Sequence, residues 1–414
     1  MKKVIIIGGG ITGLLSAYYL VKEGFEIRII DKGDLTCGAS IVNAGYIAPS
    51  HIISLASPGV ITKGLKWMWN SSSPFYIKPR FDPDFMDWAW KFKRSSTLAK
   101  VELAIPVLKD LNVKSQILYE EIINSLDFTA HYEKKGLLTV YKTSLAEREE
   151  VKKAERVKME GLEVEILNKN EVLKLEPTLR DDIRGAVYYI CDSHSTPGDL
   201  VSKLVTWLKQ QGVVFNLNEE VKSIDVSGDQ VTGVTTAKDH YEADIILLAA
   251  GSWSQSLAGS LGIKVPVQGG KGYSMDVYRE TGITIPAILA EAKVAVTPMK
   301  GFTRFAGTME FSGNNDIIRK NRVIAIATAA GRYFKDIEIT EEEKGKARSG
   351  LRPVSPDGLP FIGRSSRYSN LIIATGHAMI GWSLGAITGK LVSQIIKDDK
   401  PEVDLSPLSP GRRF

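Results

Sequence analysis

The sequence predicts an α/β fold, α+β overall, in which a parallel-sheet domain is interleaved with a mainly antiparallel-sheet domain. Three observations lead to this prediction. The chain opens with an apolar strand, a glycine-rich turn and a helical pattern, residues 262–345 are strand-like and interrupted by glycine and proline, and α/β character returns after residue 346. With 414 residues, of which 43% are hydrophobic and 24% charged, the chain is long enough for two domains of an ordinary globular protein.

The first 31 residues carry the pattern of a Rossmann-like, dinucleotide-binding βαβ unit. A β-branched strand at 4–7 is followed by three glycines at the spacing G-x-G-x-x-G: Gly8, Gly10 and Gly13. These glycines permit a tight turn, close approach of a pyrophosphate, and close packing of helix on strand. The helix over 11–23 offers its N-terminal N–H groups to phosphate, and Asp31, after a second strand at 25–30, is placed to bind ribose hydroxyls.

The remaining elements follow from periodicity and turn residues. The irregular stretch at 35–59 is rich in Gly, Ala, Ser and Pro, and a loop of that length is usually functional, so we expect it to wrap the dinucleotide. Pro197 marks the first turn of a helix, where proline is tolerated. We expect helices over 11–23, 84–128, 145–160, 198–211 and 379–396. We expect strands over 4–7, 25–30, 136–142, 213–215, 245–248, 271–278, 301–311 and 370–377.

Charge, cysteine content and hydropathy exclude several classes of protein. The formal net charge of +5 is too small and too dispersed to indicate a nucleic-acid-binding protein. Cys37 and Cys191 are far apart and lie in no C-x-x-C motif, so we expect neither a disulfide framework nor a zinc site, and we predict no metal ligands. Because a strand begins at residue 4 and no long apolar run occurs, we expect no signal peptide, no membrane-spanning helix and a cytoplasmic location.

Four of the seven tryptophans lie close together: Trp67, Trp69, Trp88 and Trp90. Basic residues flank them: Lys63, Lys66, Lys91, Lys93 and Arg94. One interpretation is a peripheral contact with a membrane, where such residues gather at the headgroup level. The preferred interpretation for most of them is a domain core with a solvated basic rim, because large aromatic side chains are usually buried.

The motifs together resemble those of the FAD-dependent D-amino-acid oxidase and dehydrogenase family, and most closely its bacterial D-amino-acid dehydrogenases. Apart from the N-terminal glycines, they are SIVNAG at 40–45, ASPGV at 56–60, KWMW at 66–69, TPGDL at 196–200, AAGSWS at 249–254, KGYS at 271–274, GLRPVSPDGLPFIG at 350–363 and TGHAMIGWSLG at 375–385. The last two are the most specific. Glycine oxidase, sarcosine oxidase and hydroxyproline dehydrogenases are similar in character, so the subfamily stays open.

Combined with this resemblance, the interleaved pattern predicts how the chain divides between two domains. The FAD-binding domain is expected to comprise 1–55, 145–260 and 346–400. The substrate-binding domain is expected to comprise 56–144 and 261–345. Residues 401–414 are expected to form a loosely held C-terminal tail.

The resemblance implies non-covalently bound FAD, and a single N-terminal fingerprint argues against a second, nicotinamide site. The residues expected to contact FAD are Gly8, Gly10, Ile11, Thr12, Gly13, Asp31, Lys32, Ala39, Ser40, Asn43, Ala44, Gly45, Tyr46, Val221, Ala250, Gly251, Trp253, Gly376, His377, Ala378, Met379, Ile380, Gly381, Trp382 and Ser383. The backbone of Val221 is expected to hold the adenine. We expect the turn around His377 to lie against the flavin, with the backbone and not the imidazole facing it.

The resemblance implies that Arg352 binds the substrate carboxylate, which arginine can do with two hydrogen bonds. The alternative is a surface arginine in a salt bridge. Tyr273 is either a second donor to that carboxylate or a core tyrosine, and His51 either borders the active-site entrance or is an exposed loop residue. Glycine oxidase has a further arginine where this chain has Met379, and Arg304 is a candidate substitute.

The implied reaction is the oxidative deamination of D-amino acids to 2-oxo acids and ammonia, by hydride transfer to the flavin. The electrons are expected to pass to quinone or another acceptor that is not a nicotinamide, with a possible peripheral contact with the inner membrane. The alternatives are an amino-acid oxidase that uses oxygen and a dehydrogenase of D-proline or cis-4-hydroxy-D-proline. One rival class is an FAD-dependent tRNA-modifying or structural flavoprotein, which the absence of a basic stripe disfavours. The other is a non-catalytic subunit of a multi-subunit oxidase, which Arg352 and the intact Gly376-His377 turn disfavour.

Overall fold

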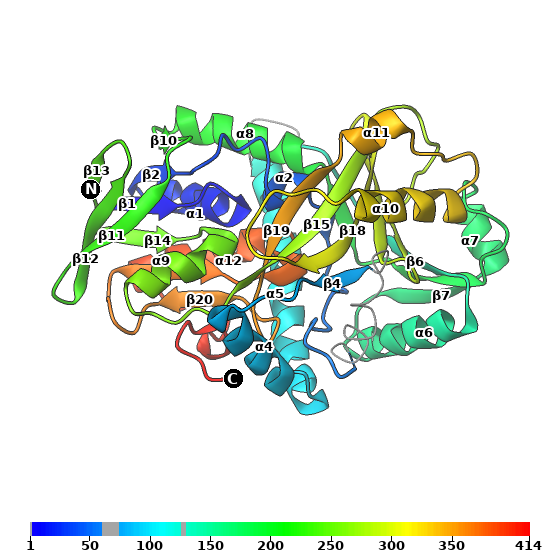
Figure 1. The fold of residues 1–414 in the computed structure, drawn as a ribbon, viewed down its shortest axis with the longest axis horizontal. Helices are drawn as coiled ribbons and strands as arrows, with labels where there is room; N and C mark the ends of the chain where they lie inside the picture. Colours follow the sequence, from blue (N-terminus) through cyan, green and yellow to red (C-terminus); the bar gives the residue numbers. More distant parts are fainter. Residues whose placement is uncertain (1, 60–73, 126–129) are drawn as a thin grey trace.

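The structure is a computed structural model that describes residues 2–59, 74–125 and 130–414. Two large sheets lie along the long axis of the molecule (Figure 1). The first has six strands in the order β10-β2-β1-β14-β21-β20. Their bounds are β1 Lys3–Ile7, β2 Glu26–Ile30, β10 Val214–Asn216, β14 Ile245–Leu248, β20 Phe361–Arg364 and β21 Leu371–Thr375.

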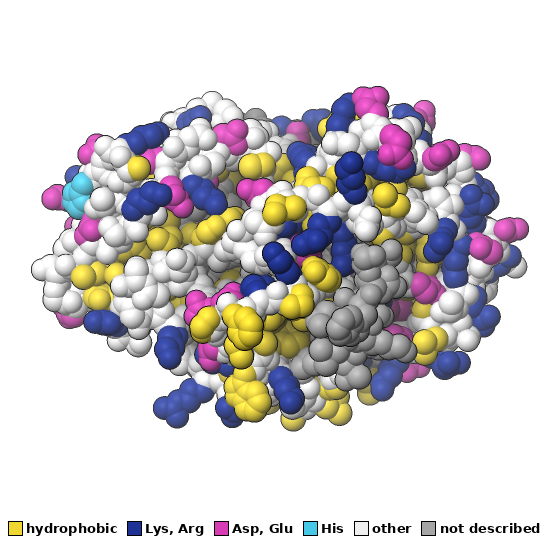
Figure 2. All heavy atoms as spheres, viewed as in Figure 1, with side chains coloured by type: hydrophobic (Ala, Val, Ile, Leu, Met, Phe, Trp, Pro, Cys, Tyr) yellow, Lys and Arg dark blue, Asp and Glu magenta, His cyan; other side chains and the backbone are white. Residues whose placement is uncertain are grey.

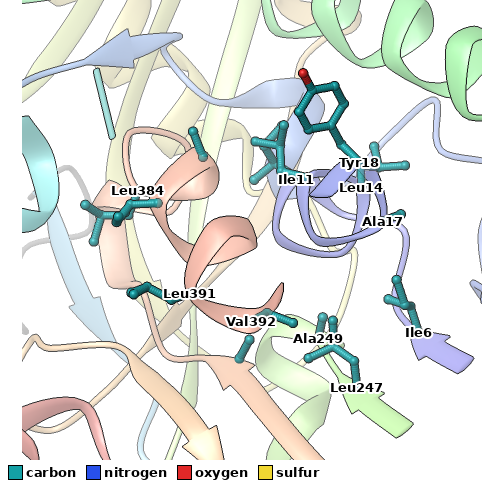
Figure 3. Packing of buried hydrophobic residues seen from close by; sticks show 14 of the residues in the cluster. Ile6, Ile11, Leu14, Ala17, Tyr18, Leu247, Ala249, Leu384, Leu391 and Val392 are labelled. Carbon is teal, nitrogen blue, oxygen red and sulfur yellow. The ribbon is translucent and has the colours of Figure 1, made fainter. Parts of the chain in front are cut away.

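The six-stranded sheet is parallel except at one edge. β1 pairs in parallel with β2 and β14, β14 pairs in parallel with β21, and β20 runs antiparallel to β21. One hydrophobic core joins strands of this sheet to the helices that cover it, and Figure 3 shows Leu14, Leu247, Leu391 and Val392, all fully buried, within this core. This confirms the predicted Rossmann-like βαβ start of the chain.

Long helices cover this sheet: α1 Ile11–Lys22, α5 Leu98–Ser125, α8 Pro197–Gln210 and α12 Gly385–Lys397. α1 and α12 approach so closely that a Cβ on Gly389 would lie 2.6 Å from the backbone of Leu15. A small antiparallel sheet adjoins β14 and is formed by β11 Val221–Ser227, β12 Gln230–Thr236 and β13 His240–Glu242. Short helices complete this part: α2 Ala39–Val42, α9 Ser254–Ser260, η1 Gly251–Trp253, η2 Ala378–Ile380 and η3 Ser406–Leu408.

The second large sheet is mainly antiparallel and has nine strands. Their order is β19-β15-β18-β17-β16-β6-β8-β7, and β4 pairs with β18. The bounds are β4 Phe75–Ile77, β6 Leu137–Tyr141, β7 Val164–Asn168, β8 Gly185–Tyr189, β15 Gln268–Val277, β16 Ala287–Leu289, β17 Val294–Met299, β18 Phe302–Phe311 and β19 Arg348–Val354. The accompanying helices are α4 Pro83–Ser95, α6 Ser144–Met159, α7 Lys169–Leu175, α10 Lys320–Tyr333 and α11 Glu341–Gly345.

A third, three-stranded sheet joins distant segments: β3 Tyr46–Ile47, β9 Ser193–Ser195 and β5 Tyr132–Glu133. The mixed α/β class that the sequence predicts is therefore confirmed. From the segment 145–260, β8 pairs with β6 and β7 pairs with β8 in the nine-stranded sheet, and α5, from the segment 56–144, packs against α12. The sheets thus do not follow the predicted boundary at 144/145, and the division into two domains stays a prediction.

Two predicted helices are interrupted. The pattern over 84–128 forms α4 and α5, which are separated at Ser96 and Thr97, and the pattern over 379–396 forms η2 and then α12. Among the described residues, no helix is both long enough and apolar enough to cross a membrane.

The expectation of a loosely held C-terminal tail is wrong. Leu408 is fully buried. The guanidinium of Arg412 donates to both carboxylate oxygens of Asp357, at 2.8 and 2.9 Å, and lies 3.8 Å from the ring centroid of Phe361. Hydrophobic and ionic contacts that involve distant residues therefore hold the tail.

Candidate active site

The turn between β1 and α1 leaves no room for larger side chains. Gly8 has a φ of 108°, and a Cβ on Gly13 would lie 2.0 Å from the carbonyl oxygen of Gly8. Gly10 is the N-cap of α1 and has no side chain to cap it, and the first turn contains no acidic residue. Ser40 Oγ accepts from the N–H of Ile11 at 2.9 Å. The N-terminus of α1 therefore presents backbone N–H groups and a positive dipole end that suit a phosphate.

Asp31 is fixed at the end of β2 by its neighbours. Its carboxylate accepts one hydrogen bond from Gly9 N and one from Gly33 N, each 2.7 Å long. Each oxygen keeps a lone pair that can accept a ribose hydroxyl. Beside it, the ammonium of Lys32 lies 3.5 Å from the ring centroid of Trp253, so this end of β2 is joined to η1.

The segment that contains α2 is anchored by the second large sheet. Asn43 donates to the carbonyls of Ala39 and Ser40 and accepts from Gly45 N, which closes the turn. Arg304 is almost fully buried and donates to the carbonyls of Ile41 and Asn43, at 2.6 and 2.9 Å.

The suggestion that Arg304 replaces a second substrate-binding arginine is wrong. Its Nε and Nη2 donate to the carboxylate of Asp276, at 2.7 and 2.9 Å. With its Nη1 already donating to backbone carbonyls, the guanidinium is committed to protein groups. Arg304 is a support of the 41–43 turn and is not available to a substrate.

The turn after β21 contains two residues with left-handed backbone, Gly376 at φ 80° and Ala378 at φ 49°. His377 is buried, and its Nε2 lies 3.0 Å from Thr388 Oγ1. This contact fits the prediction that the imidazole is structural. The carbonyls of this turn are bound by a neighbouring helix, because Tyr119 Oη and Ser115 Oγ donate to Trp382 O and Ser383 O, each at 2.6 Å.

The polar groups of α5 are functional candidates that the sequence reasoning missed. Asn112 accepts from Ser383 Oγ at 2.8 Å, and Ser115 accepts from Ile387 N near the start of α12. Asn112, Ser115 and Tyr119 recur at spacings of three and four residues, so they share one face of the helix. These polar residues on one face of an otherwise apolar helical pattern are the feature of the sequence that could have identified them.

Arg352 lies on β19, which packs against α2, η1 and η2. Its Nη1 donates to the carbonyl of Thr308 at 2.8 Å, and no carboxylate among the described residues pairs with it. Burial of the half-buried side chain lowers the pKa of the guanidinium to about 10. A Cβ on Gly272 would lie 2.2 Å from Arg352 Nη1, so the glycine provides the space that the guanidinium occupies.

Thr308, the acceptor for Arg352, has an unusual backbone. Its φ is 66°, a value that β-branched residues rarely adopt and that costs about 1–3 kcal/mol. Its Oγ1 is buried without a hydrogen-bond partner among the described residues. A strained residue with an unsatisfied hydroxyl, next to an unpaired arginine, marks a place where a polar ligand can be bound.

Tyr273 and His51 are placed differently from Arg352. Tyr273 is buried in the apolar core of the nine-stranded sheet, and its hydroxyl donates to Glu310 Oε2 at 2.8 Å. This is the arrangement of a core tyrosine. His51 is half-buried, and burial lowers its pKa to about 4. Its Nδ1 is enclosed without a partner among the described residues, so the ring is neither fully exposed nor tied into the protein.

The clustered tryptophans differ in their burial. Trp88 is buried and donates from Nε1 to Val354 O at 2.8 Å, whereas Trp90 is exposed. The core interpretation holds for Trp88. Trp67 and Trp69 lie outside the described residues.

The observed residues fit FAD. The β1–α1 turn has the cradle that a pyrophosphate needs, and Asp31 has the lone pairs that a ribose needs. Two further buried hydroxyls in the surrounding segments have no partner among the described residues: Ser252 Oγ on η1 and Ser355 Oγ after β19. Unsatisfied buried hydroxyls are costly in a closed protein, and a polar cofactor supplies the missing partners.

Comparison with known proteins decides the family. A family model described as FAD dependent oxidoreductase matches residues 3–395. The chain belongs to this family. It is 29% identical over 407 residues to the D-amino acid dehydrogenase of Vibrio vulnificus (strain YJ016), with 97% of each chain covered. It is 30% identical over 404 residues to that of Helicobacter pylori (strain J99 / ATCC 700824), with 97% of this chain and 96% of the other covered.

A solved structure shows the same fold. Glycine oxidase from Geobacillus kaustophilus superposes with a TM-score of 0.80 at 22% identity, with both chains fully covered. As an FAD-dependent oxidoreductase, the protein is an enzyme and uses FAD, which confirms the predicted family, cofactor and fold class. The roles of the individual site residues in this FAD-dependent oxidoreductase stay predictions.

Proposed function

We propose that this FAD-dependent oxidoreductase converts D-amino acids to 2-oxo acids and ammonia. The observation that carries the proposal is the guanidinium of Arg352, which has no carboxylate partner among the described residues and lies on the strand that packs against the predicted flavin-binding segments. A half-buried arginine without a counter-ion suits a substrate that brings a carboxylate. The names of the relatives, D-amino acid dehydrogenase, support the same substrate class.

The residues of this chain orient and hold the substrate. Arg352 has five N–H donors, of which Nη1 donates to Thr308 O, and the others can bind the substrate carboxylate in two parallel hydrogen bonds. Bound FAD would supply the two-electron acceptor that oxidation of the substrate Cα–H bond requires. The amino group loses its proton to water, and the resulting imine hydrolyses in water. Tyr273 takes no part, because its hydroxyl is bound to Glu310.

Helix α4 supports a membrane-bound quinone as the electron acceptor. Large apolar side chains around this helix are exposed, namely Phe81, Met86 and Trp90. Lys93 lies 5.8 Å from the Trp90 ring, and yellow side chains gather in Figure 2 where Figure 1 places α4. Exposed aromatic rings next to lysines suit the headgroup region of a bilayer. The same helix donates from Trp88 to Val354 of β19, so such a membrane contact would lie next to the substrate strand.

The test is anaerobic reduction of the flavin in the purified holoenzyme. D-Alanine should bleach the flavin absorbance, and L-alanine should not. Reduction by D-proline and not by D-alanine favours the alternative, a D-proline dehydrogenase, because oxidation of this cyclic amine releases no ammonia. If no member of a panel of D-amino acids reduces the flavin, the proposed substrate class is wrong. The reduced enzyme should then be reoxidised much faster by a water-soluble quinone analogue than by oxygen. Fast reoxidation by oxygen with stoichiometric peroxide favours the alternative, an amino-acid oxidase.

A further inference from the structure

Three side chains outside the predicted flavin site converge on the small three-stranded sheet: His131, Glu133 and His194. Glu133 on β5 pairs directly with His194 on β9, and His131 lies two residues before Glu133, on the same face. Glu133 Oε2 lies 3.3 Å from His194 Nε2 and 4.0 Å from His131 Nε2. One ligand atom can be chosen from each residue so that all three lie within 4.8 Å of one another.

His194 is the most unusual member of this cluster. Its side chain is fully buried, yet neither ring nitrogen has a hydrogen-bond partner among the described residues. Its Nε2 lies 3.3 Å from Glu133 Oε2, a separation at which one ion can be bound by both atoms. Buried polar atoms without a partner in the protein are a common sign of an unoccupied ligand site.

His131 is oriented as metal-binding histidines are. Its Nδ1 lies 2.9 Å from Thr196 Oγ1, which leaves Nε2 directed at Glu133. The Thr196 hydroxyl also accepts from Lys300 N at 2.8 Å, so it is held in place and can accept from a protonated Nδ1. A hydrogen bond of this kind from the second ring nitrogen fixes the tautomer and the orientation of a ligand histidine.

We propose that His131, Glu133 and His194 bind a divalent transition-metal ion, with Zn²⁺ as the best match. Two imidazoles and one carboxylate are ligands that Zn²⁺ takes at about 2.0–2.2 Å, and tetrahedral geometry then places ligand atoms about 3.3–3.5 Å apart, with water in the fourth position. The separation of 3.3 Å already fits, and that of 4.0 Å requires a shift of less than 1 Å. Mg²⁺ is disfavoured because it prefers oxygen ligands.

The cluster has one competitor, Lys135, whose Nζ lies 3.0 Å from Glu133 Oε2. The lysine side chain is 45% exposed, so it can turn into solvent at little cost when a metal ion takes its place. The ion would tie β5 to β9. Since β9 also pairs with β3, which begins at Tyr46 next to the predicted flavin-binding Gly45, this is a structural site that supports the flavin segment.

Cysteine spacing does not reveal this site, because its proposed ligands are histidine and glutamate side chains. His131 and Glu133 are two residues apart in the chain, but His194 is more than 60 residues away and meets them only through strand pairing.

The test uses the holoenzyme after treatment with EDTA and dialysis. Titration with ZnCl₂ in a calorimeter should show one site per chain, and Zn²⁺, but not Mg²⁺, should raise the melting temperature as its concentration rises. Glu133→Gln and His131→Gln should each weaken Zn²⁺ binding at least about tenfold, since even the partners of ligands change affinity by that much. Flavin absorbance and circular dichroism should show that both variants are folded.

Two control variants make the result specific. His240→Gln changes an exposed histidine that pairs with Asp225 at 3.2 Å, and Cys37→Ser removes an exposed thiol that could bind zinc by itself. Both should bind Zn²⁺ as the parent does. The proposal is overturned if the parent binds no Zn²⁺ at micromolar concentrations. It is equally overturned if Glu133→Gln and His131→Gln both bind it with unchanged affinity, or if Cys37→Ser abolishes binding.

Discussion

The carbonyl oxygen of Thr308 accepts a 2.8 Å hydrogen bond from Arg352 Nη1, and this contact orients the guanidinium without neutralising it. A carboxylate in the same place would cancel the charge that a substrate needs. The strained backbone of Thr308, at φ 66°, is compatible with this role, because strain persists where the surroundings enforce it.

Replacing Arg352 should weaken substrate binding far more than flavin binding. Arg352→Ala removes a charged bidentate contact, at a cost of about 2–5 kcal/mol, and Arg352→Lys should recover only part of it because lysine lacks the planar fork. Anaerobic stopped-flow reduction should show a raised apparent dissociation constant with an unchanged flavin content. As a control, Arg364→Ala removes an arginine that pairs with Asp398 and should change neither quantity. An unchanged dissociation constant in Arg352→Ala removes Arg352 from the site.

Gly10→Val should expel the flavin. A Cβ at this position would lie 3.2 Å from Ser40 Oγ. A branched side chain would also fill the space that the pyrophosphate needs. The ratio of flavin to protein absorbance after gel filtration measures the effect. Gly198→Val is the matched control, because no atom lies within 4 Å of a Cβ at that position. Wild-type flavin content in Gly10→Val would falsify the fingerprint interpretation.

Arg304→Met should lower the affinity for FAD and leave the substrate constant of the FAD-saturated enzyme unchanged. The variant removes the bonds to Ile41 O and Asn43 O and leaves Asp276 without its main buried partner, and breaking such a pair costs about 3–5 kcal/mol. Titration of apoprotein with FAD measures the first effect. The double variant Asp276→Leu/Arg304→Met separates the two contributions, since it should regain stability but not FAD affinity. Loss of stability with full FAD affinity contradicts the role of Arg304 in the 41–43 turn.

The double variant Phe81→Ser/Trp90→Glu should weaken sedimentation with anionic liposomes at low salt. Both side chains are exposed around α4, and the new carboxylate is repelled by anionic lipid. High salt should release the parent protein. Met159→Ser, at an exposed apolar position on α6, should sediment as the parent does. If the parent itself fails to sediment, the proposed membrane contact is wrong, while the proposed substrate class is unaffected.

The buried imidazole of His377 should make the protein less stable as the pH falls. Burial lowers its folded pKa to about 4, whereas an unfolded histidine titrates near 6.5, so the unfolded chain binds more protons between these values. Stability should therefore be lost as the pH falls through this window, by about 2 kcal/mol between pH 7 and pH 5 for this group. Urea midpoints in excess FAD should show a smaller pH dependence for His377→Asn. His240→Asn, at an exposed site, should keep the pH dependence of the parent. If the parent, His377→Asn and His240→Asn all show the same pH dependence of stability, His377 is not the group responsible.

Local patterns were sufficient for the start of the chain and for the eight strands that the sequence predicts. The spacing of glycines after an apolar run defines β1, α1 and the Asp31 position within a few residues, because each depends on neighbours in sequence. The break at Ser96 and Thr97 has no proline or glycine to mark it, so it was not predicted.

The roles of other side chains depend on partners that are distant in the sequence. Tyr273 and Arg304 look like ligand-binding residues until Glu310 and Asp276 are placed beside them. These partners lie 37 and 28 residues away and meet them only across the nine-stranded sheet. Arg352 could be predicted from a family motif, but the absence of a counter-ion among the described residues is visible only in three dimensions.

The order of strands in the six-stranded sheet has a consequence for biosynthesis. β14 lies between β1 and β21, so three neighbouring strands come from residues 3–7, 245–248 and 371–375. A ribosome delivers the chain from its N-terminus, at about 5–20 residues per second, so β1 and its glycine turn wait about ten seconds or more for β14 and longer for β21. Loading of FAD is therefore a late event in the life of the nascent chain. Until then the apolar edge of β1 is exposed, which makes chaperone binding and the supply of riboflavin during overexpression relevant to the yield of active enzyme.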